Sequence, residues 1–164
     1  MSARGMAGEK TLRLTGKIFG MGLAIMLSLG LFMSHAAAAK SSAVVVVVKL
    51  GGPLEDLTLK DIRSIYLGDK LFQGSSKIEP LVNGDDSVAG VFFEKILSKS
   101  KAQFKKVWKS KAFVDALVPP TQLPGSEDVL TAVKKGDASI GFVSRDALGP
   151  GDRKTIKIIY SSAQ

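Results

Sequence analysis

The sequence contains no cysteine and a single histidine, His35. The lack of cysteine excludes disulfides, lipid attachment through cysteine and thiolate metal sites. If His35 is removed with the N-terminal segment, as argued below, nucleophile systems that depend on a histidine are excluded as well. The Asp and Glu residues show no spacing that singles out a catalytic pair. We therefore predict that the protein is not an enzyme and that it uses neither a cofactor nor a metal ion.

The N-terminal segment has the pattern of a secretory signal peptide. Four basic residues precede an apolar run at 18–33, which leads to four alanines ending at Ala39. Ala37-Ala38-Ala39 matches the small-residue pattern of a cleavage site. A retained membrane anchor is the alternative, but a spanning helix needs about 20 apolar residues and this run has 16. We predict a cleavable signal peptide at 1–39 and a periplasmic domain at 40–164.

The charge of the chain bears on its partners. The full chain carries a formal net charge of +8, and residues 1–39, with four basic residues and one acidic, account for +3, so residues 40–164 carry +5. Export excludes nucleic acid as a partner, and the charge favours anionic solutes or surfaces. We expect membrane association only through residues 1–39 before cleavage.

Strand patterns appear at four places in residues 40–164. Five consecutive valines at 44–48 form a β-branched run without alternation. Such a run is typical of a strand that is covered on both faces, as central parallel strands are. Shorter apolar runs predict strands at 78–82, 139–143 and 155–160.

Helix starts are marked by capping residues. Thr58 with Asp61, and Ser100 with Gln103, have the spacing of capping boxes, and Gly68 and Ala112 mark the ends of these two helices. Ser87 and Ser126 are the expected caps of two further helices, and we expect loops at 69–77 and 119–125. This order of elements predicts an α/β fold with a mostly parallel sheet flanked by helices.

The helix at 100–112 has two distinct sides. Phe104, Val107 and Trp108 form its expected buried stripe, and lysines recur at positions 101, 105 and 109. We interpret the lysines as a solvated helix face. The alternative is a contact surface for lipid or for an acidic partner.

Four segments in this order resemble the phosphate ABC transporter substrate-binding proteins, which have a type II periplasmic-binding-protein-like domain. They are LTLKDIRSIYLGDK, IEPLVN, the helix after Ser87 with Phe93, and SEDVLTAVKKGDASIGFVS. The resemblance covers about residues 44–148 and is closest to short, single-lobe members. It implies a single lobe of the two-lobed fold, a role in transport, a small oxyanion such as phosphate as ligand, and an ABC permease or another envelope protein as partner.

The resemblance also implies where an anion would bind. A helix that starts just after a strand offers backbone N–H groups to an anion, and the corresponding loop of the family reads R-x-D-G-S-G-T. Asn83 stands at its Arg, and Asp86 replaces its first Gly. The implied anion-binding residues are Ser87, Val88, Ala89, Asp85 and Asn83.

These replacements weaken the site that the resemblance implies. An amide cannot equal the bidentate, charge-assisted bonds of the guanidinium group, and the two carboxylates before the helix oppose an anion. The sequence leaves two functions open. The chain is a solute-binding-like protein that binds an oxyanion weakly, or it is a periplasmic interaction module that kept the fold and lost the ligand. Under either function Ser87 is also expected as the N-cap of its helix.

Overall fold

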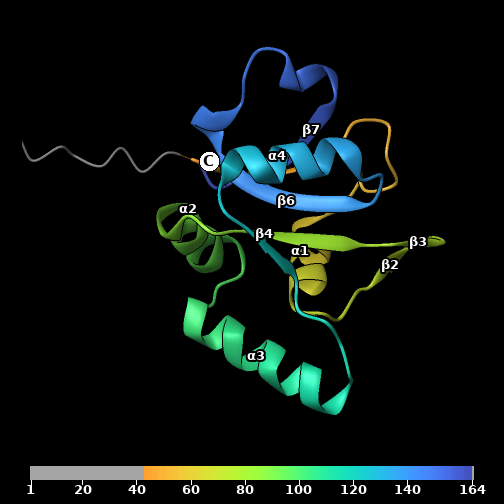
Figure 1. The fold of residues 1–164 in the computed structure, drawn as a ribbon, viewed down its shortest axis with the longest axis vertical. Coiled ribbons are helices and arrows are strands. Elements are labelled where there is room, and N and C mark those ends of the chain that lie inside the picture. Colours follow the sequence, from red (N-terminus) through yellow and green to blue (C-terminus); the bar gives the residue numbers. More distant parts are fainter. Residues whose placement is uncertain (1–42, 164) are drawn as a thin grey trace, which may run out of the picture. The chain divides into compact units, whose positions relative to one another are not determined.

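The computed structural model describes residues 43–163, so the predicted signal segment and its cleavage site lie outside the described residues. Strands and helices are interspersed along the chain, and the colours of Figure 1 follow their order. The strands are β1 (Val44–Lys49), β2 (Phe72–Gln73), β3 (Ser76–Lys77), β4 (Glu79–Asn83), β5 (Thr121–Leu123), β6 (Ser139–Ser144) and β7 (Ile156–Ser161). The α-helices are α1 (Leu59–Tyr66), α2 (Asp86–Val91), α3 (Lys101–Val114) and α4 (Ser126–Lys135). A π-helical turn, η1 (Phe92–Ile96), continues α2, and two 3₁₀ turns, η2 (Arg145–Ala147) and η3 (Asp152–Lys154), precede β7.

Five strands form one sheet in the order β5-β4-β6-β1-β7. β4 pairs in parallel with β5 and β6, whereas β1 pairs antiparallel with β6 and β7. Four strands therefore point the same way, which confirms the predicted α/β fold with a mostly parallel sheet. The expectation that the valine strand is itself parallel is wrong. Burial on both faces requires apolar side chains at every position, whatever the direction of the neighbouring strands.

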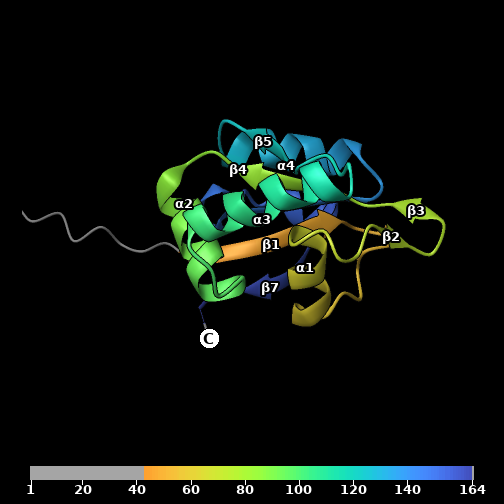
Figure 2. The same cartoon turned by 90° about the horizontal axis from the view of Figure 1, so that it is seen from below.

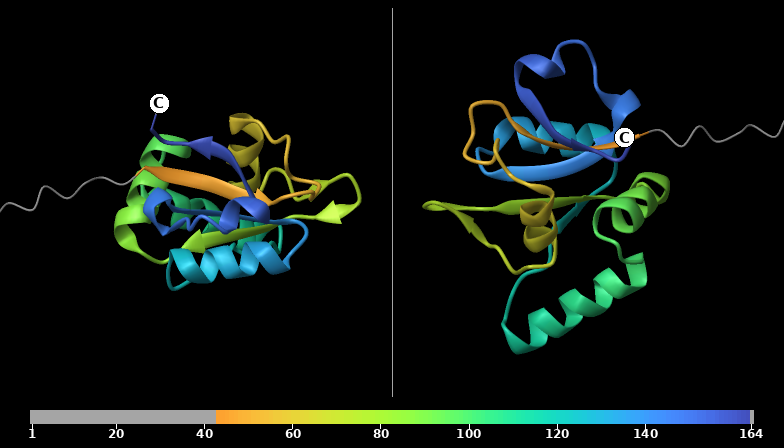
Figure 3. Two further views of the ribbon diagram at one scale, coloured as in Figure 1. Left: turned by 90° about the horizontal axis from the view of Figure 1, so that it is seen from above. Right: turned by 180° about the vertical axis from the view of Figure 1, so that it is seen from behind.

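The valine strand β1 is covered on both faces, as predicted. Val44, Val46 and Val48 belong to a core formed with α1, α2, η1 and α3. Val45 and Val47 belong to a second core formed with α4. Successive side chains of a strand point to opposite faces, so one run of valines serves two cores. The left panel of Figure 3 shows α4 on one side of β1 and α1 on the other.

Aromatic rings fill the first core. The rings of Phe92 and Phe142 stack with centroids 3.8 Å apart, and the Tyr66 ring meets Phe92 edge-on at 4.7 Å. The Tyr66 hydroxyl lies 3.0 Å from the carbonyl oxygen of Leu81 and 3.2 Å from that of Ile140. This hydroxyl therefore ties α1 to β4 and β6, and burial raises the pKa of Tyr66 above its ordinary value.

The helix α3 packs on this core through Phe104 and Trp108, as predicted, whereas Val107, the third residue of the predicted buried stripe, is half-buried. In Figure 2, α3 and α1 lie on the viewer's side of β1. The indole Nε1 of Trp108 donates to the Tyr66 carbonyl at 2.9 Å. Gly68, which ends α1 with a φ of +75°, lies under the indole ring, and a Cβ there would come 2.9 Å from it. The glycine thus meets both a backbone and a packing requirement.

The two predicted capping boxes are confirmed. Thr58 and Asp61 exchange hydrogen bonds of 2.9 and 3.2 Å at the start of α1. Ser100 and Gln103 do the same at 2.8 and 3.2 Å at the start of α3. Both motifs are local, so a spacing of three residues was enough to predict them.

Three other local predictions are wrong. The segment at 69–77, expected as a loop, contains the hairpin β2–β3, and the expected loop at 119–125 contains β5. Ser126 is the first residue of α4 and Gly125 is its N-cap. The Ser126 hydroxyl instead accepts hydrogen bonds from the Asn83 side chain at 2.9 Å and from Ser144 N–H at 3.2 Å. These contacts join segments that are distant in the sequence, so local spacing did not indicate them.

Both outer edges of the five-stranded sheet are protected against pairing with another strand. Pro120 and Pro124 flank β5 and have no N–H group to donate. The register of β7 shifts opposite Val46 and Val47, which marks a β-bulge. Short strands, prolines and bulges are common ways of blunting a sheet edge.

Candidate functional site

The candidate anion loop lies at the carboxyl end of β4, where the chain turns into α2. Asp85, not Ser87, is the N-cap of α2. One carboxylate oxygen of Asp85 accepts hydrogen bonds from Ser87 N–H at 2.8 Å, Ser87 Oγ at 2.6 Å and Val88 N–H at 3.4 Å. The prediction that Ser87 caps the helix is therefore wrong. Asp and Ser are both good caps, and the point at which β4 ends selects Asp85, whose backbone is still extended.

The side chain of Asn83 faces the interior of the fold. Only 1% of Asn83 is exposed. Its amide nitrogen lies 2.9 Å from Ser126 Oγ and 3.3 Å from the Phe142 carbonyl oxygen, and its amide oxygen accepts from Asp85 N–H at 3.0 Å. All these partners are protein groups. At the position where the family's loop has an arginine, this chain has an amide that holds β4, α4 and β6 together.

The remaining residues of the loop differ in exposure and charge. Val88 and Ala89 are buried, and Ala89 N–H donates to the Asp85 carbonyl at 2.8 Å as part of the helix. Asp86 is exposed and forms an ion pair with Lys101 of α3. The structure thus brings together all five residues implied as anion ligands, with their donors directed to protein acceptors.

The electrostatics of the loop oppose an anion. The Ser87 hydroxyl and the N–H groups of Ser87 and Val88 hold the pKa of Asp85 below its ordinary value. Asp85 is therefore a carboxylate at neutral pH. A phosphate that approached these N–H groups would have to displace that carboxylate and face Asp86 as well.

Two hollows lie elsewhere in the described residues. One, of about 400 Å³, lies beside the 145–153 segment and contains Arg145 and Arg153. The other, of about 260 Å³, lies between α3 and the Pro119-Pro120 segment, with Phe104 and Trp108 among its lining residues. No sequence pattern indicated the first hollow, because two arginines eight residues apart in a loop form no recognisable motif.

Within residues 43–163, no three Asp or Glu side chains converge to form a metal site. In the same part of the chain, every buried side-chain nitrogen or oxygen has a hydrogen-bond partner. No helix among residues 43–163 is long and apolar enough to cross a membrane.

Two solved structures with a similar fold are described as phosphate transport proteins. A candidate phosphate ABC transporter substrate-binding protein from Clostridium perfringens, crystallised with bound phosphate, matches with a TM-score of 0.54 and 17% identity. The match covers 73% of this chain and 45% of that one. An ABC-type phosphate transport receptor from Vibrio cholerae matches with a TM-score of 0.51 and 17% identity, over 73% of this chain and 46% of that one. No protein-family model and no curated protein sequence matches the chain.

These findings define the class of fold. Residues 43–163 have an α/β fold of the periplasmic-binding-protein type, as the sequence predicted. The chain spans less than half the length of the two solved proteins. At 17% identity the likeness establishes the fold, and the ligand has to be argued from this chain's own residues.

Proposed function

We propose that this chain is an exported, non-enzymatic solute-binding-like protein that has lost tight phosphate recognition and acts as an interaction module in the cell envelope. Of the two functions that the sequence left open, the geometry favours the second. An ABC permease or another envelope component remains the partner class that the resemblance to phosphate transporters implies.

The observation that carries this proposal is the inward position of Asn83. An arginine at this position would offer a planar array of donors to phosphate, whereas Asn83 is buried and bonded to Ser126, Phe142 and Asp85. The chain has therefore replaced a ligand contact with a structural one. The carboxylate of Asp85, which engages the first N–H groups of α2, supports the same conclusion.

Calorimetric titration of the protein with inorganic phosphate tests the proposal. We expect a Kd weaker than about 100 μM, which corresponds to a binding free energy of about −5.5 kcal/mol or less favourable. Micromolar binding would contradict the loss of phosphate recognition.

If phosphate did bind at micromolar concentration, two variants would locate its binding site. Ser87→Ala would abolish binding at the start of α2, and Arg145→Ala would abolish binding in the 400 Å³ hollow.

A further inference from the structure

The outward face of α3 is strongly basic. The helix contains five lysines and no acidic residue. Lys101 and Lys111 form ion pairs with Asp86 and Asp69, the latter at 2.8 Å. Within residues 43–163, the other three make no ion pair, and all of them are exposed: Lys105, Lys106 and Lys109. Ion pairing within residues 43–163 therefore does not account for these three lysines on α3.

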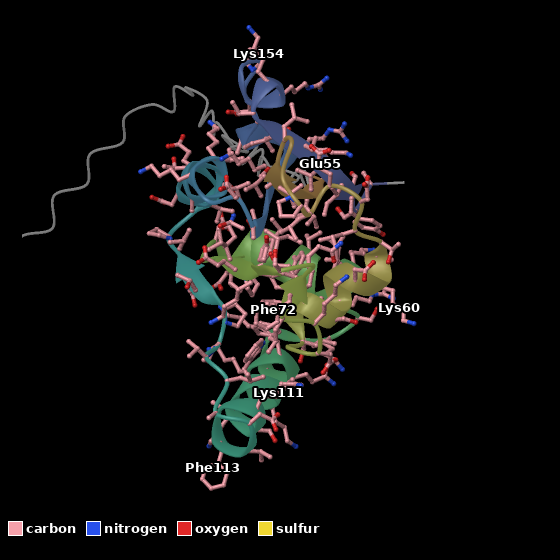
Figure 4. The ribbon with its side chains drawn as sticks, turned by 90° about the vertical axis from the view of Figure 1, so that its right-hand side faces the viewer. Glu55, Lys60, Phe72, Lys111, Phe113 and Lys154 are labelled. Atoms are coloured by element: carbon pink, nitrogen blue, oxygen red, sulfur yellow. The ribbon has the colours of Figure 1, made fainter. Side chains whose placement is uncertain are left out.

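Apolar side chains continue this basic face at the end of the helix. Residues four apart lie on one stripe of a helix, so Phe113 follows Lys105 and Lys109 on the same stripe. Phe113 is 91% exposed, Val114 73% and Val118 85%. Figure 4 shows Phe113 at the tip of α3, pointing away from the rest of the domain. We call Phe113, Val114 and Val118 the apolar tip.

The apolar tip is held in place by the fold. Leu117, between Val114 and Val118, packs against the first core, and its N–H donates to the Lys111 carbonyl at 3.3 Å. The preceding Ala116 has a φ of +51°, a left-handed conformation that turns the chain sharply after α3. The segment is thus anchored at Leu117, while the side chains on either side of it remain in solvent.

We propose that α3 docks on an anionic lipid surface, with the apolar tip entering the headgroup region and Lys105, Lys106 and Lys109 contacting lipid phosphates. The inference rests on the proposed function, because it names the envelope component that the module contacts. A basic helix face with apolar side chains beside it is the usual composition of a segment that binds at a membrane surface. Each lysine close to such a surface raises partitioning about fivefold.

Lipid fits this surface better than an acidic protein does. The apolar tip protrudes, and a protruding anchor suits a soft headgroup layer. The lysines carry flexible ammonium groups that match an array of phosphates, and α3 has no arginine for fixed bidentate contacts. A protein partner could also bind by adding a strand to the sheet edge at β5. Pro120 and Pro124 flank β5 and disfavour such pairing.

The absence of cysteine from the chain allows a direct test on the full-length protein. Phe113→Cys, labelled with an environment-sensitive fluorophore, reports on the apolar tip, and Lys154→Cys serves as the matched control. Lys154 is exposed and lies at the opposite end of the domain from Phe113 in Figure 4. Both proteins are mixed with vesicles of phosphatidylcholine alone or with about 30% phosphatidylglycerol. Because the label reports locally, attachment through residues 1–39 would not imitate docking by α3.

We expect a blue shift of the label at 113 with the anionic vesicles, and none at 154. The shift should decline with added salt. It should need at least tenfold more lipid in the variant with Lys105→Glu and Lys109→Glu, while Lys154→Glu in the Phe113→Cys protein should change nothing. Equal shifts at 113 and 154, or no shift at 113, would overturn the proposal. A shift at 113 with polyglutamate but not with vesicles would overturn it in favour of an acidic protein partner. Phosphate titration tests the proposed function separately, so the two can fail independently.

Discussion

The amide nitrogen of Asn83 lies 2.9 Å from the hydroxyl oxygen of Ser126, across 43 residues of sequence. Through this contact the end of β4 is joined to the first turn of α4. The same amide group also engages the Phe142 carbonyl and the Asp85 N–H. Asn83 is therefore a buried connector between three elements.

Truncation of this connector should destabilise the fold. We expect Asn83→Ala to lower the free energy of unfolding by about 1–3 kcal/mol, because it leaves buried polar groups unsatisfied. Ser126→Ala should cost less, and the double variant should cost less than the sum of both, since the residues share one bond. Urea unfolding measures all three. Strict additivity would mean that the Asn83–Ser126 contact contributes nothing.

The identity of the α2 cap predicts a contrast between two neighbouring residues. Asp85→Ala removes the acceptor of three hydrogen bonds and should cost about 0.5–2 kcal/mol. Ser87→Ala removes one exposed donor and should stay within about 0.5 kcal/mol. Thermal unfolding of the two variants distinguishes them. A larger loss of stability in Ser87→Ala than in Asp85→Ala would mean that Ser87 is the N-cap, as the sequence predicted.

The two sides of α3 should respond differently to substitution. Phe104→Ala or Trp108→Ala should lower stability by about 3–5 kcal/mol, because each side chain is buried against the first core. Lys105→Ala and Lys109→Ala should stay within about 0.5 kcal/mol, as exposed changes usually do. Chemical denaturation is the measurement, and equal effects at all four positions would contradict the burial of Phe104 and Trp108.

Acid should destabilise the protein through specific carboxylates. Hydrogen bonds from Lys70, at 2.7 Å, and from Thr58 hold the pKa of Asp61 well below its ordinary value of 3.8. Lys134, at 2.5 Å, lowers the pKa of Asp152 in the same direction. A group whose pKa is lower in the folded state contributes stability above its unfolded pKa and loses it as the pH falls through the folded pKa. The free energy of unfolding should thus decline below about pH 4.

Asp61→Asn offers a test of this pH dependence. The variant should be less stable than the parent at neutral pH, and the difference should shrink as the pH falls below about 4, because the unfolded parent then takes up a proton at Asp61 that the folded parent does not. Asp115→Asn, at an exposed position without an ion pair in residues 43–163, serves as the control. A difference between Asp61→Asn and the parent that stays constant with pH would show that Asp61 acts through packing alone.

Export predicts a defined N-terminus. Cleavage after Ala39 would leave Lys40 as the first residue of the periplasmic protein. N-terminal sequencing of protein from a periplasmic extract checks this, with a change of Ala37 and Ala39 to bulky residues as the variant that should block processing. Recovery of the intact chain in the membrane fraction would instead support a retained anchor.

The sequence determined the local features of this protein. The spacing of Thr58 and Asp61, and of Ser100 and Gln103, predicted two capping boxes, because each bond lies within four residues. The valine run predicted a strand buried on both faces, since that composition depends only on what covers the strand. The order of strands and helices was enough for the fold class.

Only the tertiary structure decided which polar residues of the loop after β4 are buried and bonded within the protein. Asp85, Asp86 and Ser87 could each begin a helix, and the length of β4 selected Asp85. Asn83 matched a ligand position in sequence, but its partners come from Ser126 and Phe142, which lie 43 and 59 residues away. The direction of β1 likewise depends on its pairing with β6 and β7. Such contacts join distant segments, and local sequence patterns do not encode them.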